Sequence, residues 1–240
     1  MALPKLGIKV FADGAFLEDI RTLNEHPLVQ GFTTNPTLMR QAGVTDYEGF
    51  AHQVLETITD KPISFEVFAD DLDTMYSQAR KIASWASNVN VKIPVTTTQG
   101  EFTGPILERL SAEGVCLNVT AVFTLDQVTR IMAKLDPQTP SIISIFAGRI
   151  ADTGKDPIPH MVQAAELLRS FPKADLLWAS PREVLNIYQA DAAGCQIITV
   201  TKDLLKKLEF FQKDLEEFSL DTVKMFYKDA TSAGYRIELD

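Results

Sequence analysis

Cysteine and histidine are scarce in this 240-residue sequence. The two cysteines, Cys116 and Cys195, are far apart and belong to no C-x-x-C pair. A disulfide framework is therefore not expected, and a cytoplasmic location is the default for such cysteine usage. The three histidines are isolated from one another in the sequence, so none forms a cluster with the spacing of a zinc site. We expect neither a metal nor a cofactor.

Long hydrophobic runs and excess positive charge are also missing. No stretch approaches the ~18 apolar residues of a membrane-spanning helix. The first residues, MALPKLGIKVF, lack the apolar core and cleavage site of a signal peptide. The 32 acidic and 23 basic residues give a net charge of −9. We therefore expect no nucleic acid and no membrane as partner, although a small anionic substrate can still bind at a locally positive site.

Eight short apolar segments alternate with helical patterns along most of the chain. The predicted strands are Lys9–Asp13, Leu28–Phe32, Ile63–Phe68, Asn88–Thr98, Cys116–Val122, Ser141–Phe146, Asp175–Ser180 and Gln196–Val200. Strands that alternate with helices favour a parallel sheet, and eight such units predict a single (β/α)8 TIM barrel. A doubly wound open sheet is the alternative. Against it, no G-x-G-x-x-G motif follows the first strand.

Two further helical patterns, Lys202–Phe218 and Leu220–Ala230, follow the last predicted strand. We expect one domain over residues 1–240, in which the C-terminal helices, about residues 202–240, pack on the barrel or on a neighbouring subunit. Apolar residues at helical spacing are commonly part of a core or of a subunit contact.

Lys92 stands between Val91 and Ile93 in the fourth predicted strand. Burial of an ammonium without a partner is costly, and a desolvated amine is a nucleophile for carbonyl carbon. Alternatively, this lysine protects the edge of a sheet or extends to solvent. A closed barrel has no edge to protect, which weakens that alternative.

Polar side chains occur at or near the end of nearly every predicted strand, and these ends share one rim in a barrel. They are Asp13, Asn35, Glu66, Lys92, Asn118, Thr120, Arg149, Ser180 and Arg182. Each has a structural alternative: Asp13 can cap a helix, Asn35 can serve an Asn-Pro turn, and Glu66 can pair with Lys92. Together these residues predict a site at that rim.

A lysine, two carboxylates and two arginines in one site suit a definite chemistry. The amine condenses with a ketone to form a Schiff base, and the iminium accepts electrons when the adjacent carbon–carbon bond breaks. A carboxylate moves protons to and from substrate hydroxyls. The arginines, with Ser180, suit a phosphate group.

The chain is similar to the transaldolase family, including its short branch of fructose-6-phosphate aldolases. The segments that carry the resemblance are KVFADGA, GFTTNPTLM, SFEVFA, VNVKIPVT, LNVTAVFT, IFAGRIAD, LLWASPR and AGCQIITV. The resemblance implies a class I aldolase-type barrel that acts on sugar phosphates, needs no cofactor and forms a homo-oligomer.

The same resemblance implies a role for each site residue. Lys92 is the Schiff-base lysine and Asp13 the proton-transferring acid and base, while Glu66 and Thr120 hold the catalytic water. Asn35 and Asn118 contact the hydroxyl and ketone end of the donor sugar, and Thr33 is a further substrate-binding residue. The remaining substrate contacts, including those to the acceptor phosphate, are Phe146, Arg149, Ser180 and Arg182.

Two positions bear on the reaction within the family. The aldolase branch carries glutamine where this chain has Glu66 and tyrosine where it has Phe146. Both residues here match the transaldolases, so transfer of a dihydroxyacetone unit is favoured over simple aldol cleavage. Aldol cleavage with free dihydroxyacetone remains the alternative. A relative that binds sugar phosphates without catalysis is a third, disfavoured by the complete set Asp13, Glu66, Lys92 and Thr120.

Overall fold

The computed structural model describes residues 6–239. Residues 1–5 and 240 of the expected domain lie outside the described residues. The first five residues of the segment MALPKLGIKVF are among them. The described chain forms two compact units, which meet in sequence between Lys206 and Lys207.

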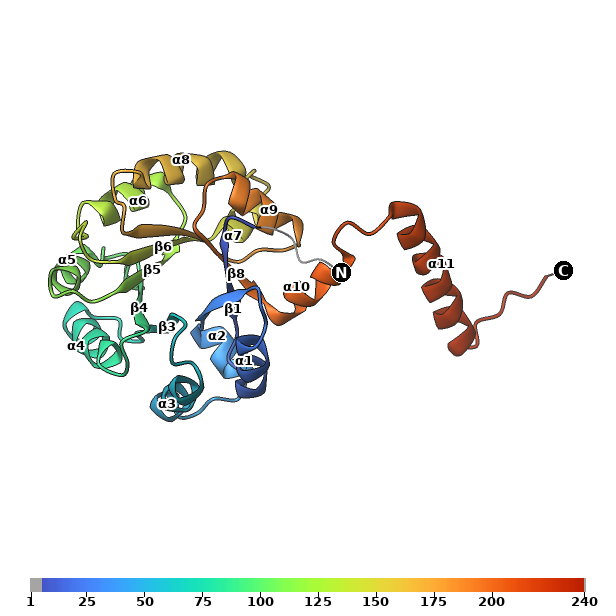
Figure 1. The fold of residues 1–240 in the computed structure, drawn as a ribbon, viewed down its shortest axis with the longest axis horizontal. Helices are drawn as coiled ribbons and strands as arrows, with labels where there is room; N and C mark the ends of the chain where they lie inside the picture. Colours follow the sequence, from blue (N-terminus) through green and yellow to red (C-terminus); the bar gives the residue numbers. More distant parts are fainter. Residues whose placement is uncertain (1–5, 240) are drawn as a thin grey trace. The chain divides into compact units, whose positions relative to one another are not determined.

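The first unit is a closed barrel of eight parallel strands in sequence order, in which β8 returns to pair with β1. Helices ring the strands when the barrel is viewed nearly end on (Figure 1). The predicted TIM barrel is therefore confirmed. The strands are β1 (Lys9–Asp13), β2 (Val29–Thr33), β3 (Ile63–Glu66), β4 (Val89–Pro94), β5 (Leu117–Val122), β6 (Ser141–Ile145), β7 (Ala174–Trp178) and β8 (Ile197–Thr201).

The helices of this unit follow the strands as the sequence pattern indicates. They are α1 (Leu17–Asn24), α2 (Pro36–Gln41), α3 (Tyr47–Thr57), α4 (Leu72–Ala83), α5 (Gly104–Ala112), α6 (Leu125–Met132), α7 (Ala147–Asp152), α8 (Ile158–Leu168), α9 (Leu185–Ala192) and α10 (Lys202–Lys206). The six-residue α7 was not predicted, because it is too short to show a helical repeat of apolar residues.

Local sequence explains where these elements begin and end. Every residue of β6 is buried, as expected for a parallel strand covered on both faces. Thr124 and Gln127 form a reciprocal capping box that starts α6. Gly114 follows α5 with φ +80°, a left-handed conformation that glycine adopts without strain. Such local signals set the boundaries, while the closed sheet brings the C-terminal strand ends to one rim.

The second unit holds a 3₁₀ helix, η1 (Lys207–Phe210), and one long helix, α11 (Leu215–Ser232). The predicted continuous helix over Lys202–Phe218 is wrong. Gln212 has φ 56°, which an α-helix does not accommodate. The Asp214 carboxylate then accepts hydrogen bonds from two backbone N–H groups and starts the new helix, α11.

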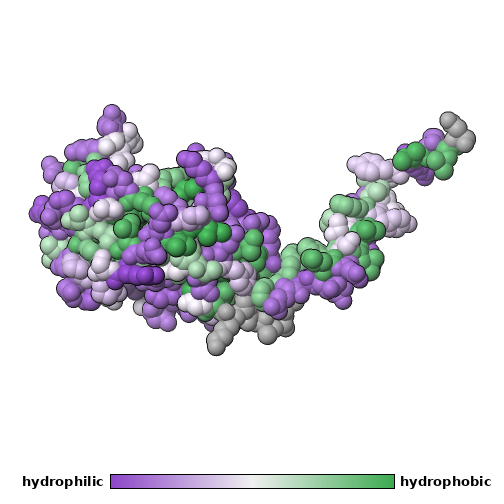
Figure 2. Space-filling view, turned by 90° about the horizontal axis from the view of Figure 1, so that it is seen from above, coloured by the Kyte–Doolittle hydropathy of each residue, from purple (hydrophilic) through white to green (hydrophobic). Residues whose placement is uncertain are grey.

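α11 buries none of its side chains. Its exposed apolar residues include Leu220, Val223, Met225, Phe226 and Tyr227. Figure 2 shows hydrophobic residues among hydrophilic ones along this segment. The expected packing of residues 202–240 on the barrel or a neighbouring subunit stays a prediction. Within residues 6–239, no helix is long and apolar enough to cross a membrane.

Candidate active site

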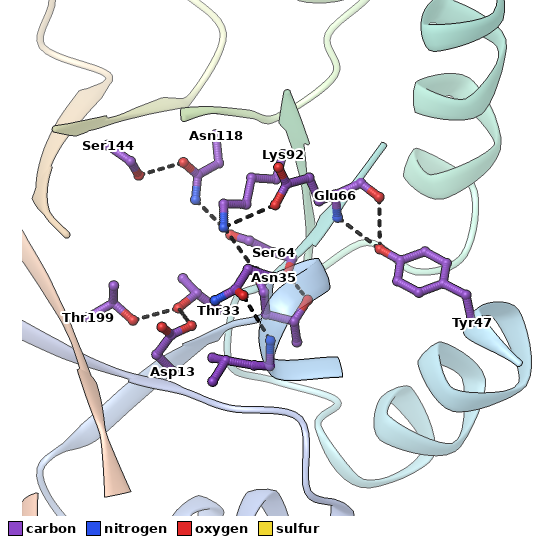
Figure 3. Close-up of polar contacts among 12 residues, drawn as sticks. Asp13, Thr33, Asn35, Tyr47, Ser64, Glu66, Lys92, Asn118, Ser144 and Thr199 are labelled. Carbon is purple, nitrogen blue, oxygen red and sulfur yellow. Dashed lines mark hydrogen bonds and ion pairs between the residues drawn. The ribbon is translucent and has the colours of Figure 1, made fainter. Parts of the chain in front are cut away.

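Lys92 lies within β4, and the register of the sheet sets it beside two other polar residues. Glu66 of β3 and Asn118 of β5 are its partners on the two sides. Side chains at paired positions of parallel strands point to the same face of the sheet. All three therefore lie at one level inside the barrel (Figure 3). Because the sheet is closed, the edge-strand interpretation of Lys92 is wrong.

The Lys92 ammonium is almost completely enclosed, with only 7% of the residue exposed. Its Nζ donates a hydrogen bond of 2.9 Å to the Thr34 carbonyl oxygen and lies 3.3 Å from Glu66 Oε2. The pairing of Glu66 with Lys92, the structural alternative for Glu66, is therefore present as a contact. A buried ammonium needs such partners, because desolvation without them costs several kcal/mol, on the order of 5.

Asp13 ends β1 and is paired in register with Thr33 of β2. The Thr33 hydroxyl donates a 2.8 Å hydrogen bond to Asp13 Oδ1. Burial raises the pKa of Asp13 above its ordinary value, while the Lys92 charge and hydrogen bonds from Thr33 and Asn35 act in the opposite direction. A carboxyl group with a raised pKa exchanges protons closer to neutral pH, which suits an acid and base.

Asn35 caps a helix and Asp13 does not. Asp13 caps no helix, because α1 has Phe16 at its N-cap. Asn35 does cap α2, since its Oδ1 accepts a 3.0 Å hydrogen bond from the Leu38 backbone N–H. Asn35 also bonds the Asp13 carboxyl group. Its turn role and its place in the site are therefore compatible.

Asn118 is fully buried and held by two serines. Its Nδ2 donates to Ser64 Oγ at 3.0 Å, and its Oδ1 accepts from Ser144 Oγ at 2.6 Å. These bonds fix the orientation of the amide beside Lys92. Sequence reasoning missed both serines, and also Thr199, whose hydroxyl contacts that of Thr33. Each is a small polar residue between two apolar neighbours in its strand, a signal that could have identified them.

Thr120 has a buried hydroxyl that finds no hydrogen-bond partner within the described part of the chain. The next residue, Ala121, has φ 58°, and the pairing of β5 with β6 shifts register between Val119 and Val122. A left-handed conformation is uncommon for a residue other than glycine, and irregularities of this kind gather at functional sites. A buried, unpaired hydroxyl is a ready partner for a water or a substrate group.

Nearly all the predicted site residues line one cavity of about 380 Å³. Those lining it are Asp13, Thr33, Asn35, Glu66, Lys92, Asn118, Thr120, Phe146, Arg149 and Ser180. The two cations among these residues are Lys92 and Arg149. The Arg149 guanidinium lies over the Phe146 ring, 5.1 Å from the ring centroid. The cavity thus combines a buried amine, two carboxyl groups and an exposed guanidinium.

Arg182 is the one predicted site residue that does not line this cavity. Its Nε donates to Asp152 Oδ1 at 3.0 Å, its Nη2 contacts the other carboxylate oxygen, and its Nη1 donates to Ser180 Oγ at 3.1 Å. The guanidinium lowers the pKa of Asp152 through these hydrogen bonds. An anion that binds Arg182 bidentately has to compete with this carboxylate.

The wall of the cavity near Ser180 depends on a glycine. Ser180 has φ 64°, and a Cβ added at Gly148 would lie 1.5 Å from the Ser180 carbonyl oxygen. We expect Gly148→Ala to reduce the free energy of unfolding by about 3 kcal/mol or more, because backbone has to move. Chemical denaturation measures this loss. Gly14→Ala is the control, since nothing lies within 4 Å of its added Cβ; equal losses in both variants would contradict the prediction.

Known proteins resemble the chain over nearly its whole length. The model of the family described as transaldolase/fructose-6-phosphate aldolase matches residues 10–237. The chain belongs to this family. Two relatives at 33% and 35% identity are "Probable transaldolase" of Dehalococcoides mccartyi and "Probable transaldolase 2" of Listeria monocytogenes. The matches cover 84% and 88% of this chain, and 90% and 98% of the relatives.

Solved structures of low sequence identity share the fold of this chain. KGPDC from Streptococcus mutans matches with a TM-score of 0.56 at 10% identity, over 84% of this chain and 90% of the other. A putative phosphonomutase from Burkholderia cenocepacia matches with a TM-score of 0.53 at 11% identity, over 94% of both chains. At such identities the likeness shows the fold alone. The transaldolase-family relatives are therefore the ones that bear on the site.

Proposed function

We propose that this transaldolase-family chain transfers a dihydroxyacetone unit between sugar phosphates through a Schiff base on Lys92. The observation that carries the proposal is the enclosed Lys92 amine, set in one cavity with the carboxyl groups of Glu66 and Asp13. Donors of the fitting class are ketose phosphates such as fructose 6-phosphate and sedoheptulose 7-phosphate. The acceptor is an aldose phosphate.

In the first step the Lys92 ammonium passes a proton to the neighbouring Glu66 carboxylate, and the free amine attacks the ketone carbon of the donor; the proton returns when the hydroxyl leaves as water. The carbinolamine that forms loses water and becomes an iminium. Asn118, whose amide is fixed beside Lys92 by Ser64 and Ser144, binds the oxygen at the ketone end. Thr33 and Asn35 bind neighbouring hydroxyls at the same rim.

In the second step the bond between the third and fourth carbons of the ketose breaks. The electron pair moves to the iminium, and the hydroxyl proton on the fourth carbon passes to the Asp13 carboxylate. The shortened aldose phosphate leaves, and an enamine of dihydroxyacetone remains on Lys92. Attack of this enamine on the acceptor aldehyde reverses these events, with Asp13 returning the proton to the new alkoxide.

Glu66 and Thr120 position the water that is released and then consumed. The buried Thr120 hydroxyl, unpaired within residues 6–239, and the Glu66 carboxylate beside Lys92 support this role. Water that adds to the final iminium regenerates the carbinolamine, which collapses to free the amine and the ketose product. Each turnover therefore returns Lys92 to its starting form.

Arg149 and Ser180 hold the phosphate at the mouth of the cavity, and Arg182 joins them after leaving Asp152. We expect Arg149→Ala to raise KM for fructose 6-phosphate roughly 10- to 100-fold, since a charge-assisted hydrogen bond contributes about 1.5–3 kcal/mol. KM for unphosphorylated fructose should barely change. Steady-state kinetics with both sugars test this, and Arg182→Ala should have the smaller effect. A similar rise in KM for fructose would contradict it.

The distinction between transfer and aldol cleavage rests on Phe146, a cavity-lining residue without a hydroxyl. A phenol there could help protonate the enamine and release free dihydroxyacetone. With phenylalanine, the enamine instead persists until an aldehyde arrives. The experiment compares fructose 6-phosphate alone with fructose 6-phosphate plus erythrose 4-phosphate. Free dihydroxyacetone formed as fast without the acceptor as product forms with it would assign the chain to aldol cleavage.

We also propose that the chain forms a homo-oligomer in the cytoplasm through its C-terminal segment. The exposed apolar side chains of α11 support the oligomer. Apolar surface of this kind is commonly buried between subunits. Light scattering coupled to size-exclusion chromatography should give a mass that is a multiple of 26.6 kDa. The double variant Val223→Glu and Phe226→Glu should shift it toward one chain; an unchanged mass would contradict this role of α11.

A further inference from the structure

We propose that Tyr47 is a positioning residue for Glu66, because its phenol completes the hydrogen bonding that β2 leaves open along β3. Tyr47 is the first residue of α3 and does not line the cavity. Its hydroxyl nevertheless reaches the backbone of Glu66 from outside the barrel, as Figure 3 shows. The inference rests on the proposed function of Glu66 and Lys92.

The gap arises because β2 ends at Thr33, which pairs with Ser64, while β3 continues to Glu66. The two strands pair only through Phe32 with Ile63 and Thr33 with Ser64. The last bonds come from Thr34, whose backbone N–H and hydroxyl both donate to the Ser64 carbonyl oxygen, at 3.2 and 3.0 Å. The chain of β2 then turns away into α2. Beyond Ser64, no strand within residues 6–239 pairs with the side of β3 that faces β2.

Glu66 is the residue this gap affects. Backbone groups of a strand alternate sides with a period of two, so the N–H and C=O of Glu66 face the same way as those of Ser64. On the opposite side, Val67 N–H donates to the Lys92 carbonyl oxygen at 3.1 Å, so β3 stays joined to β4. An unpaired backbone donor and acceptor next to the site would leave this strand end free to shift.

The Tyr47 hydroxyl satisfies both backbone groups of Glu66. Its oxygen accepts from Glu66 N–H at 2.8 Å and donates to the Glu66 carbonyl oxygen at 2.9 Å. A hydroxyl can do both at once, and phenylalanine can do neither. Burial, as the main cause, raises the pKa of Tyr47, so the donor proton is retained. One side chain thus takes the place of a missing strand residue.

The ring of Tyr47 is itself held by aromatic contacts. It packs edge-on against Phe68 with 4.3 Å between ring centroids, and it lies near Phe65 and Trp85. These contacts do not involve the hydroxyl, so Tyr47→Phe should keep them and remove only the two hydrogen bonds to Glu66. The carboxylate would then no longer be fixed 3.3 Å from Lys92 Nζ.

Kinetics of Tyr47→Phe test the consequence for catalysis. We expect kcat to fall roughly 10- to 100-fold with KM little changed, since a displacement of about 1 Å in a reacting group can cost that much. The same substitution in a Glu66→Gln background should have a much smaller effect, because residues that act through one another are not additive. An equal effect in both backgrounds, or a normal kcat, would overturn the inference.

Hydrogen exchange tests the anchor itself and needs no activity. The Glu66 amide should exchange at least about tenfold faster in Tyr47→Phe than in the parent. The control is Asn88→Ala, which also removes two bonds from a side chain to backbone, those to the Ile58 and Lys61 carbonyl oxygens, at the opposite rim. It should change neither Glu66 exchange nor kcat. Unchanged Glu66 exchange in Tyr47→Phe would overturn the anchor, whereas an inactive parent chain would overturn only the proposed function.

Discussion

Lys92→Met is expected to lower kcat roughly 10⁴-fold or more, because it removes the amine on which every covalent step depends. Methionine fills much the same space as the lysine stem in this enclosed position. The variant should therefore fold, as circular dichroism and thermal unfolding can verify. Steady-state assays of transfer from fructose 6-phosphate to erythrose 4-phosphate measure the loss.

The matched control is Lys61→Met. Lys61 donates to a backbone carbonyl, that of Asn24, but it precedes β3 and does not line the cavity. It should keep nearly all of the transfer activity. Transfer activity of Lys92→Met close to that of the parent would contradict the Schiff-base mechanism, whatever the control does.

Asp13→Asn is expected to have two opposite effects, on catalysis and on stability. Proton transfer by a positioned carboxyl group contributes about 10²- to 10⁴-fold, so kcat should fall by that order. Stability at neutral pH should rise, because the amide carries no charge to desolvate while it still accepts the hydrogen bond from Thr33.

The pH dependence of that stability difference follows from the raised pKa of Asp13 in the folded chain. Between the ordinary value of 3.8 and the raised one, the folded state binds more protons than the unfolded state. The contribution of Asp13 to the free energy of unfolding therefore falls as pH rises through this interval. Asp13→Asn lacks this fall. Its gain in the free energy of unfolding over the parent should therefore vanish below about pH 3.8 and reach its full size above the raised pKa. Thermal unfolding from pH 3.5 to 8 measures it, with pH taken in steps of about half a unit. A difference in Tm that stays constant across this range would contradict the assignment of the burial cost to Asp13.

Much of the fold was predictable because each strand is recognisable from its local sequence. Segments such as Ser141–Ile145 are rich in β-branched residues, as buried strands commonly are. Eight such segments, each followed by a helix, leave few ways to close the sheet. The break between η1 and α11 was not predictable in the same way, because it depends on the backbone conformation of Gln212.

The site residues also differ in whether the local sequence could identify them. Lys92, Glu66 and Asn118 were identifiable because polar residues are rare in buried strands, and strand register then brings the three together. Tyr47 gave no such signal, since its hydroxyl acts on the backbone of a residue 19 positions away. Asp152 was missed for the same reason: its partner Arg182 lies 30 residues further along the chain. Long-range contacts of this kind depend on how whole elements pack, which no local pattern encodes.

The central claim is that Lys92 forms the covalent bond to the substrate, and reductive trapping tests it most directly. Borohydride reduces an iminium to a stable secondary amine, so treatment in the presence of fructose 6-phosphate should add one substrate-derived mass to the chain. Peptide mapping should place that mass on Lys92, and the Lys92→Met variant should acquire none. A complete absence of adduct, or an adduct on a different lysine, would contradict the mechanism.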